Sequence, residues 1–230
     1  MKCNLVILSG AGISAESGIK TFRDADGLWE NHSIEEVATP EAWKNNPTLL
    51  QRFYNERRLK VISSNPNLAH HYFKELQEHF HVQIITQNID DLHERAGNSN
   101  VLHLHGNIRY AKSSGPNPES KYYLIEGHEL KMTDFCDDGF PLRPHVVWFG
   151  EEVPLLSDAA EIIKQADIFI VIGTSLQVYP AARLIHNAPK KARKIVVDPA
   201  AKKLNISTDY IILNCTAEES VSHLKQILGH

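Results

Sequence analysis

The stretch Asn4–Ala15, with the sequence NLVILSGAGISA, decides the fold. The apolar run up to Ser9 predicts a buried strand, and the G-x-G-x-x-A pattern after it is typical of a dinucleotide-binding turn. Gly10 and Gly12 would let the backbone turn tightly and approach a pyrophosphate, whose charge the next helix would meet with its N-terminus. The alternative is a glycine turn that only joins a strand to a helix.

An ordinary dinucleotide-dependent dehydrogenase is not favoured. Such enzymes carry an acidic residue about 20 positions after the glycine turn, at the end of a second strand. The available carboxylates, Asp24 and Asp26, lie in a polar loop. The glycine turn therefore needs support from the rest of the chain.

Further apolar runs, bounded by turn residues, follow along the chain. Their length and β-branched content predict strands buried on both faces, as in a parallel sheet. Stretches with helical spacing separate several of them, which indicates an α/β fold with short crossovers. The runs cover residues 82–86, 101–104, 145–149, 168–172, 194–197 and 210–213.

Two regions interrupt this alternation and predict a smaller module. Residues 20–67 are helical in pattern and rich in aromatics, and residues 110–143 contain a turn-forming Ser/Gly/Pro/Asn tract. We expect a single catalytic domain over residues 1–230, in which these two regions form the small part. The large part would comprise residues 1–19, 68–109 and 144–230.

Composition excludes several classes of protein. The chain has 230 residues, 42% hydrophobic and 23% charged, as expected for a globular domain. Its net charge of -4 gives no reason to expect nucleic acid or a membrane as a partner. The longest apolar run, Ile168–Ile172, is far shorter than the roughly 20 residues of a membrane span. We expect a cytoplasmic protein, with a monomer favoured and the oligomeric state left open.

Five segments follow one another along the chain: GAGISAESGI (10–19) followed by Thr21-Phe22-Arg23, TQNID (86–90), LHGN (104–107), VVWFGE (146–151) and GTSL (173–176). In this order they resemble the signatures of the sirtuins, the NAD-dependent protein-lysine deacylases. The resemblance implies a Rossmann-like parallel sheet with helices on both faces and a small inserted domain that has a helical module. It also implies NAD as the cofactor and acyl-lysine proteins as substrates.

By resemblance, His105 is the catalytic base and Asn88 a second catalytic residue. An imidazole can accept a proton near neutral pH, which suits the role. His103 would point to the same side of a strand as His105, and only the family match and the flanking glycine choose between them. The resemblance implies that the cofactor is held by Gly10, Ala11, Gly12, Ala15, Phe22, Arg23, Trp29, Gln87, Asn88, Ile89, Asp90, Gly173, Thr174, Ser175, Asp198 and Thr216.

The match weakens towards the C-terminus. The family often has an Asn and a Glu near the adenosine, where this chain reads Val196-Val197-Asp198. Asp198 can accept from ribose hydroxyls, but the amide is missing. Thr216 begins a capping box with Glu219, and capping is the alternative to a contact with adenine.

A helix over residues 47–62 would carry Tyr54 and Arg57 on one face, three residues apart. An arginine there could extend to solvent, but Tyr-x-x-Arg resembles the class III, desuccinylase and demalonylase, branch of the sirtuins. In that branch the pair binds the distal carboxylate of a succinyl or malonyl lysine, a group that a guanidinium holds with two charge-assisted bonds. The substrate-binding strand would contribute Val147, Trp148, Phe149 and Gly150.

Most sirtuins hold the small domain with a four-cysteine zinc site, and this chain resembles a zinc-less variant. It has three cysteines in all, with only Cys136 in residues 110–143. A mixed site of His128, Cys136 and His145 fits no zinc spacing, so we expect no metal. A hairpin over residues 121–130, with Phe135 and Phe140, would stabilise the module instead.

Two other functions remain open at this stage. One is a catalytically idle NAD-sensing module. The other is an NAD hydrolase or ADP-ribosyltransferase, which shares cleavage of the nicotinamide bond but has no lysine channel. An extended peptide could pair with the backbone of the predicted strand at residues 146–151, which favours the deacylase.

Overall fold

The centre of the molecule is a parallel sheet of six strands. The computed structural model describes residues 2–21 and 32–230. The strands of this sheet are β1 Asn4–Ser9, β2 His81–Thr86, β3 Val101–His103, β7 Ile168–Ile172, β8 Arg193–Val197 and β9 Tyr210–Leu213. Their order is β3-β2-β1-β7-β8-β9, and every neighbouring pair is parallel. Leu5 of β1, for example, pairs with Val82 of β2 and Ile168 of β7.

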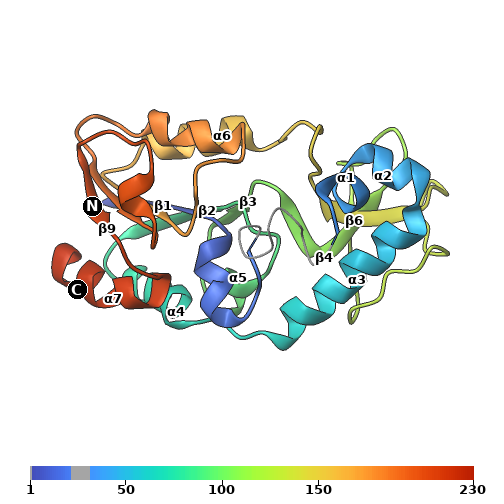
Figure 1. Ribbon diagram of the computed structural model, residues 1–230, viewed down its shortest axis with the longest axis horizontal. Helices are drawn as coiled ribbons and strands as arrows, with labels where there is room; N and C mark the ends of the chain where they lie inside the picture. The colour runs from blue at the N-terminus through green and yellow to red at the C-terminus, as the bar shows by residue number, and fades with distance from the viewer. Residues whose placement is uncertain (1, 22–31) are drawn as a thin grey trace.

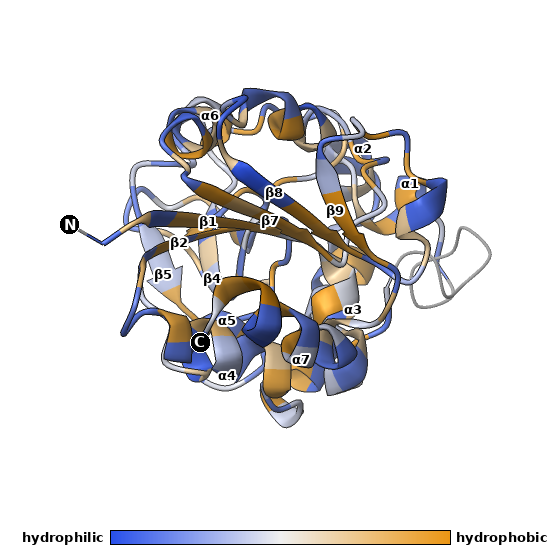
Figure 2. Ribbon diagram, turned by 90° about the vertical axis from the view of Figure 1, so that its left-hand side faces the viewer, coloured by the Kyte–Doolittle hydropathy of each residue, from blue (hydrophilic) through white to orange (hydrophobic). Residues whose placement is uncertain are grey.

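Helices cover both faces of this sheet. They are η1 Ala11–Ser17, α4 Leu68–Leu76, α5 Leu92–Arg95, α6 Leu156–Lys164, η2 Ala181–Asn187, η3 Ala201–Lys203 and α7 Ala217–Leu228. Because side chains alternate along a strand, Leu5 and Ile7 share a cluster with α4 and α7, whereas Val6 and Leu8 share one with α6 and η2. Figure 2 shows the apolar strands between these two layers. The predicted α/β, Rossmann-like fold is confirmed.

A smaller unit lies at the end of the molecule away from the two termini (Figure 1). It contains an antiparallel sheet of order β5-β4-β6, formed by β4 Gly106–Ser113, β5 Tyr122–Leu124 and β6 Leu142–Val146. Beside the sheet lie α1 Ile34–Val37, α2 Pro40–Asn45 and α3 Pro47–Ser63. Helix α3 begins at Pro47 because the Asn46 side chain accepts from the Leu49 amide at 3.0 Å and proline suits the first helical position.

One predicted strand is wrong. Residues 145–149 do not form a buried parallel strand, because β6 is antiparallel to β4 and ends at Val146. Beyond it, the Val147 amide donates to the His105 carbonyl, and the Glu151 amide donates to the Trp148 carbonyl to close a turn. The backbone groups of this segment are therefore not arranged as a strand.

The core of the small sheet also differs from expectation. Phe135 and Phe140 are 55% and 41% exposed, so they do not stabilise the unit from within. Strand β5 pairs with β4 and does not form a hairpin within residues 121–130. The side chains that pack together are smaller or aliphatic: Ala111, Ile125, Leu130, Cys136 and Leu142, with Tyr123 against them.

The sequence predicted that the large part ends at residue 109 and the small part begins at residue 110. This border falls inside β4, which runs without a break from Gly106 to Ser113. The division into a large part and a small part, as drawn from the sequence, stays a proposal. Among the described residues, no helix is both long and apolar enough to cross a membrane.

The strand order reverses between β1 and β7. From β1 the chain builds β2 and β3 on one side, and it later builds β7, β8 and β9 on the other. In open α/β sheets, ligands bind at the carboxyl ends of the strands where such a reversal occurs. Ser9 and Ile172 end these two strands, so the residues that follow them are placed to line a ligand site.

Candidate functional site

Two glycine loops meet at this reversal. The Gly12 amide donates to the Gly173 carbonyl at 2.8 Å, and a Cβ atom on Gly12 would lie 2.7 Å from the Gly173 Cα. Gly173 itself has φ +64°, a conformation that glycine adopts without strain. The glycines are therefore required for packing of one loop against the other. Whether the same backbone also approaches a pyrophosphate stays a prediction.

A cavity of about 380 Å³ opens beside these loops. Its wall is drawn from both units of the molecule, including η1, the ends of β2, β7 and β8, and α3. Every described residue that the sequence assigned to the site lines it: Gly10, Ala11, Gly12, Ala15, Tyr54, Arg57, Gln87, Asn88, Ile89, Asp90, His105, Val147, Trp148, Phe149, Gly150, Gly173, Thr174, Ser175, Asp198 and Thr216. Phe22, Arg23 and Trp29 lie outside the described residues.

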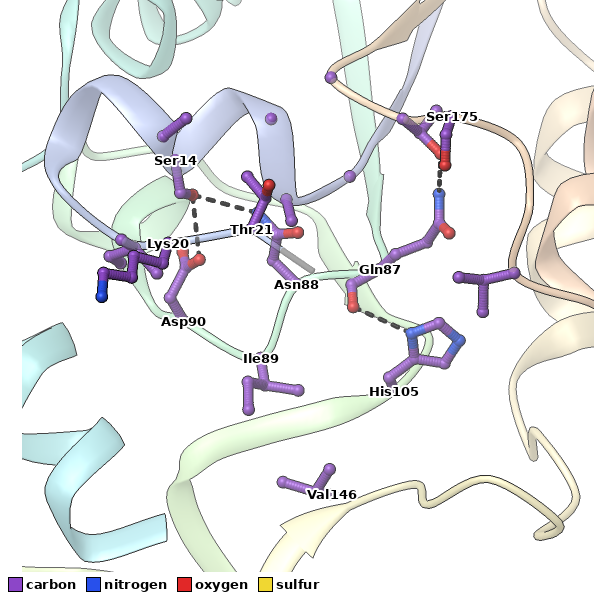
Figure 3. A pocket seen from close by; sticks show the side chains of 18 of the residues that line it. Ser14, Lys20, Thr21, Gln87, Asn88, Ile89, Asp90, His105, Val146 and Ser175 are labelled. Atoms are coloured by element: carbon purple, nitrogen blue, oxygen red, sulfur yellow. Dashed lines mark hydrogen bonds between the residues drawn. The ribbon is translucent and has the colours of Figure 1, made fainter. Parts of the chain in front are cut away.

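Asn88 and Asp90 are joined by a residue to which the sequence gave no role. The Ser14 hydroxyl donates to Asp90 Oδ2 at 3.0 Å and accepts from Asn88 Nδ2 at 3.1 Å (Figure 3). The Leu92 amide donates to Asp90 Oδ1 at 3.2 Å. Burial raises the pKa of Asp90, and the hydrogen bonds from Ser14 and Leu92 lower it. The only sequence signal for Ser14 was its place inside the glycine motif.

His105 is held as a neutral base. Its Nδ1 lies 2.9 Å from the Gln87 carbonyl, which can only accept, so Nδ1 carries the proton and Nε2 keeps its lone pair (Figure 3). Burial lowers the pKa of His105, and the bond to Gln87 only partly offsets this. The imidazole is therefore neutral at pH 7 and able to accept a proton at Nε2.

His103 and His105 have different environments. Strand β3 ends at His103 and the next two residues form a turn, so the alternation rule does not extend to His105. Both rings reach the loop after β2, but only His105 lines the cavity. His103 contacts the Asn88 carbonyl through Nδ1 and Glu94 through Nε2.

The N-terminus of α7, with Thr216 and Ala217, lines one end of the cavity. The expected capping box is confirmed, with Thr216 and Glu219 each accepting from the other's backbone amide. The Thr216 hydroxyl also donates to Glu16 at 2.7 Å, and Glu16 accepts from the Glu218 amide at 2.8 Å. Asp198 is buried and accepts from the Ala200 amide at 2.8 Å. Glu16 thus links the glycine loop to the capped helix, a role that no motif indicated.

At the other end, Tyr54 and Arg57 share the cavity wall. Tyr54 is fully buried, and its hydroxyl accepts from Trp148 Nε1 at 3.1 Å. Burial raises the pKa of Tyr54, which keeps the hydroxyl protonated. The Arg143 guanidinium lies 3.8 Å from the centre of the Trp148 ring and pairs with Glu151 at 2.6 Å. These contacts fix the indole that holds Tyr54.

No group of three His, Cys, Asp or Glu side chains suited to a metal occurs in residues 2–21 and 32–230. In the small sheet, Cys136 Sγ donates to the Ser113 hydroxyl at 3.4 Å. Lys112, only 3% exposed, pairs with Glu119 at 2.6 Å. The expectation of a metal-free unit stays a prediction.

Comparison with known proteins gives consistent matches. A family model described as "Sir2 family" matches residues 10–180. An NAD-dependent protein deacylase of Helicobacter pylori is 52% identical over 225 residues, which is 98% of this chain and 95% of that protein. The protein of the same name from Bacteroides thetaiotaomicron is 47% identical over 229 residues, covering 98% of this chain and 97% of its own.

Solved structures agree with these matches. A crystal structure of a Sir2 homolog–NAD complex is 39% identical with a TM-score of 0.84, covering 99% of this chain and 91% of that one. A Sir2–p53 peptide–NAD+ complex is 29% identical with a TM-score of 0.78, covering 99% and 94%.

Proposed function

Since this chain belongs to the Sir2 family, we propose that it is an NAD-dependent protein-lysine deacylase that removes succinyl and malonyl groups as well as acetyl groups. Acyl-lysine, NAD and one water would give the unmodified lysine, nicotinamide and O-acyl-ADP-ribose. One observation carries the proposal: a single cavity joins the neutral base His105, the Ser14-Asn88-Asp90 cluster and the pair Tyr54 and Arg57.

The donors and acceptors around the cavity fit NAD. Asp90 is a buried carboxylate that can accept from a carboxamide, and Asp198 at the other end can accept from ribose hydroxyls. Thr174, Ser175 and the glycine loop line the same cavity and offer hydroxyl and backbone groups. When bound, NAD supplies the ribose carbon that receives the acyl oxygen as its bond to nicotinamide breaks.

The chain's own residues would perform three tasks in this reaction. His105 would take a proton at Nε2, because Nδ1 is committed to the Gln87 carbonyl. Asn88 and Asp90, fixed by Ser14, would orient the reacting end of the cofactor. Ile89, between these two residues, would cover that end and exclude water.

Acyl specificity would rest on Tyr54 and Arg57. The Tyr54 oxygen accepts from Trp148 Nε1, and a protonated tyrosine hydroxyl is also a donor of the kind that a carboxylate accepts. Arg57 supplies a positive charge on the same wall of the cavity. A neutral acetyl group would use neither group, which is the physical basis of the expected preference for succinyl and malonyl lysine.

Mass spectrometry of one reaction with NAD and a succinyl-lysine peptide tests the proposal. O-succinyl-ADP-ribose together with the unmodified peptide is the expected result. Free ADP-ribose with an unchanged peptide would support a hydrolase, and unchanged NAD would support an idle NAD-sensing module. The expected monomer and cytoplasmic location remain predictions, which size-exclusion chromatography and cell fractionation test.

A further inference from the structure

His103 lies behind the loop that carries Asn88 and Asp90, outside the cavity. Its side chain is 11% exposed and makes two short polar contacts. Nδ1 is 3.0 Å from the Asn88 carbonyl oxygen, and Nε2 is 2.6 Å from Glu94 Oε1 on α5. The next histidine, His105, contacts the preceding carbonyl, that of Gln87. Two histidines thus hold two consecutive carbonyls of the same loop.

The two partners of His103 differ from those of an ordinary neutral histidine. A backbone carbonyl and a carboxylate are both acceptors, and a neutral imidazole has only one N–H to donate. Both contacts are satisfied together only when each ring nitrogen carries a proton. The 2.6 Å distance to Glu94 is short, and hydrogen bonds between charged groups are shorter than those between neutral ones.

We propose that His103 is an imidazolium, held in that state by Glu94, which positions the Asn88–Asp90 loop for catalysis from the side opposite the cavity. This role rests on the proposed deacylase function. His103 touches neither cofactor nor substrate in this arrangement, so it is a positioning residue. By fixing the Asn88 carbonyl it fixes the segment whose side chains meet at Ser14.

The charges that face His103 support its protonation. Glu94 and Asp90 are acidic, whereas His93 and His145 have lowered pKa values, chiefly because of burial, and stay neutral. Burial by itself lowers the pKa of His103, but Glu94, the Asn88 carbonyl and Asp90 together raise it above its usual value.

Asn107 and Asp90 also lie near the His103 ring. Asn107 Nδ2 lies 3.4 Å from Nε2 of His103, but both atoms are donors when His103 is charged, so the two form no hydrogen bond in that state and Nε2 donates to Glu94. Burial raises the pKa of Asp90, and the positive charge of His103 lowers it. A charged His103 therefore also helps to keep the Asp90 carboxylate ionised at the wall of the cavity.

The charge can be observed directly in the wild-type protein labelled with 15N-histidine. Long-range 1H–15N spectra distinguish an imidazolium from either neutral tautomer, and a His103→Gln spectrum identifies the resonances. At pH 7 we expect both ring nitrogens of His103 to be protonated, while His105 shows the neutral Nδ1–H form in the same spectrum. A neutral His103 at pH 7 would overturn the inference.

Glu94→Gln tests the catalytic role without removing the ring. We expect the His103 pKa to fall, since the carboxylate that raises it is gone. At a pH between the two His103 pKa values, read from the spectra of the variant and of the wild type, kcat should fall about tenfold with KM for NAD changed less than twofold. Lowering the pH below the variant's own His103 pKa should restore most of the activity relative to wild type, because His103 regains its proton. Glu78→Gln, at an exposed site, should behave like wild type at every pH.

A loss in Glu94→Gln that is equal at all pH values, or an unchanged kcat, would contradict the positioning role. If the wild-type protein forms no O-acyl-ADP-ribose at all, the proposed function fails, whereas the spectra still decide the charge of His103. The two failures are therefore distinguishable.

Discussion

At the scale of single residues, identical side chains have different properties because their partners differ. His103 and His105 are two positions apart, yet one faces two acceptors and the other faces one. The resemblance selected His105 as the base, which stays a prediction; of the two histidines, His105 is the one that lines the cavity. The sequence could not predict the Glu94 contact, because it depends on how α5 packs beside the end of β3.

Replacing His105 should remove catalysis while leaving the fold intact. For His105→Asn we expect kcat to fall by about 10²- to 10⁴-fold, the usual contribution of a general base. The measurement is release of nicotinamide with an acetyl-lysine peptide. His79→Asn, at an exposed position, is the matched control. Full activity in His105→Asn would refute the assignment.

The pH profile reports on the same base. Burial lowers the pKa of His105, so the base stays neutral and active below the usual histidine value of about 6.5. We therefore expect the acidic limb of kcat/KM to have its midpoint below pH 6.5. A midpoint above pH 7 would contradict a desolvated, neutral His105.

Arg57 should determine acyl preference. Arg57→Met keeps an unbranched apolar stem but removes the guanidinium and its charge, so we expect kcat/KM for a succinyl peptide to fall at least about tenfold, with less than threefold change for an acetyl peptide. Arg52→Met on the same helix is the control, because Arg52 is 69% exposed. An unchanged ratio of the two rates would rule out this role.

At the scale of elements, the sequence predicted correctly those strands and caps whose formation depends only on neighbouring residues. The strands at Asn4–Ser9, Ile168–Ile172 and Tyr210–Leu213 have the predicted bounds, and the cap of α7 forms as its sequence indicates. The error at residues 145–149 has a tertiary cause. Side chains and backbone of that segment bond to partners brought in from α3 and from the end of β3.

The cap of α7 gives a stability prediction. Thr216→Ala removes the side-chain oxygen that accepts from Glu219 and the hydroxyl that donates to Glu16. We expect a loss of about 1 kcal/mol in the free energy of unfolding, measured by urea denaturation. Ser222→Ala, on the exposed face of the same helix, should cost less than half as much.

At the scale of the whole molecule, buried histidines tie stability to pH. Burial lowers the pKa of His70 to about 3, so His70 is neutral in the folded protein near neutral pH. In the unfolded chain it gains a proton below about 6.5. The stabilisation is therefore complete above pH 6.5 and is lost as the pH falls from there towards 3.

Urea denaturation at several pH values measures this effect. Each histidine of this kind adds a slope of up to about 1.4 kcal/mol per pH unit below 6.5. We expect His70→Gln to have a shallower slope than wild type, and His79→Gln to match wild type. Equal slopes in all three proteins would show that His70 is not responsible.

The small unit should not depend on a metal. Its sheet has an apolar core around Ala111 and Leu142, and the buried Lys112 beside it pairs with the more exposed Glu119. We expect less than about 0.1 zinc per chain by elemental analysis, and the same melting temperature with and without a chelator. Stoichiometric zinc would overturn the prediction of a metal-free unit.

The sequence by itself determined the alternation of strands and helices, the glycine loop and the order of the family motifs, because these depend on local conformational preference and on residue identity. Only the tertiary structure decided that Ser14 joins Asn88 to Asp90, that Trp148 holds Tyr54 and that Glu94 faces His103. Ser14 lies 74 residues from Asn88 and 76 from Asp90 in the chain, Trp148 lies 94 from Tyr54, and Glu94 lies 9 from His103. Their geometry depends on how the two sheets and their helices pack, and no local pattern encodes it.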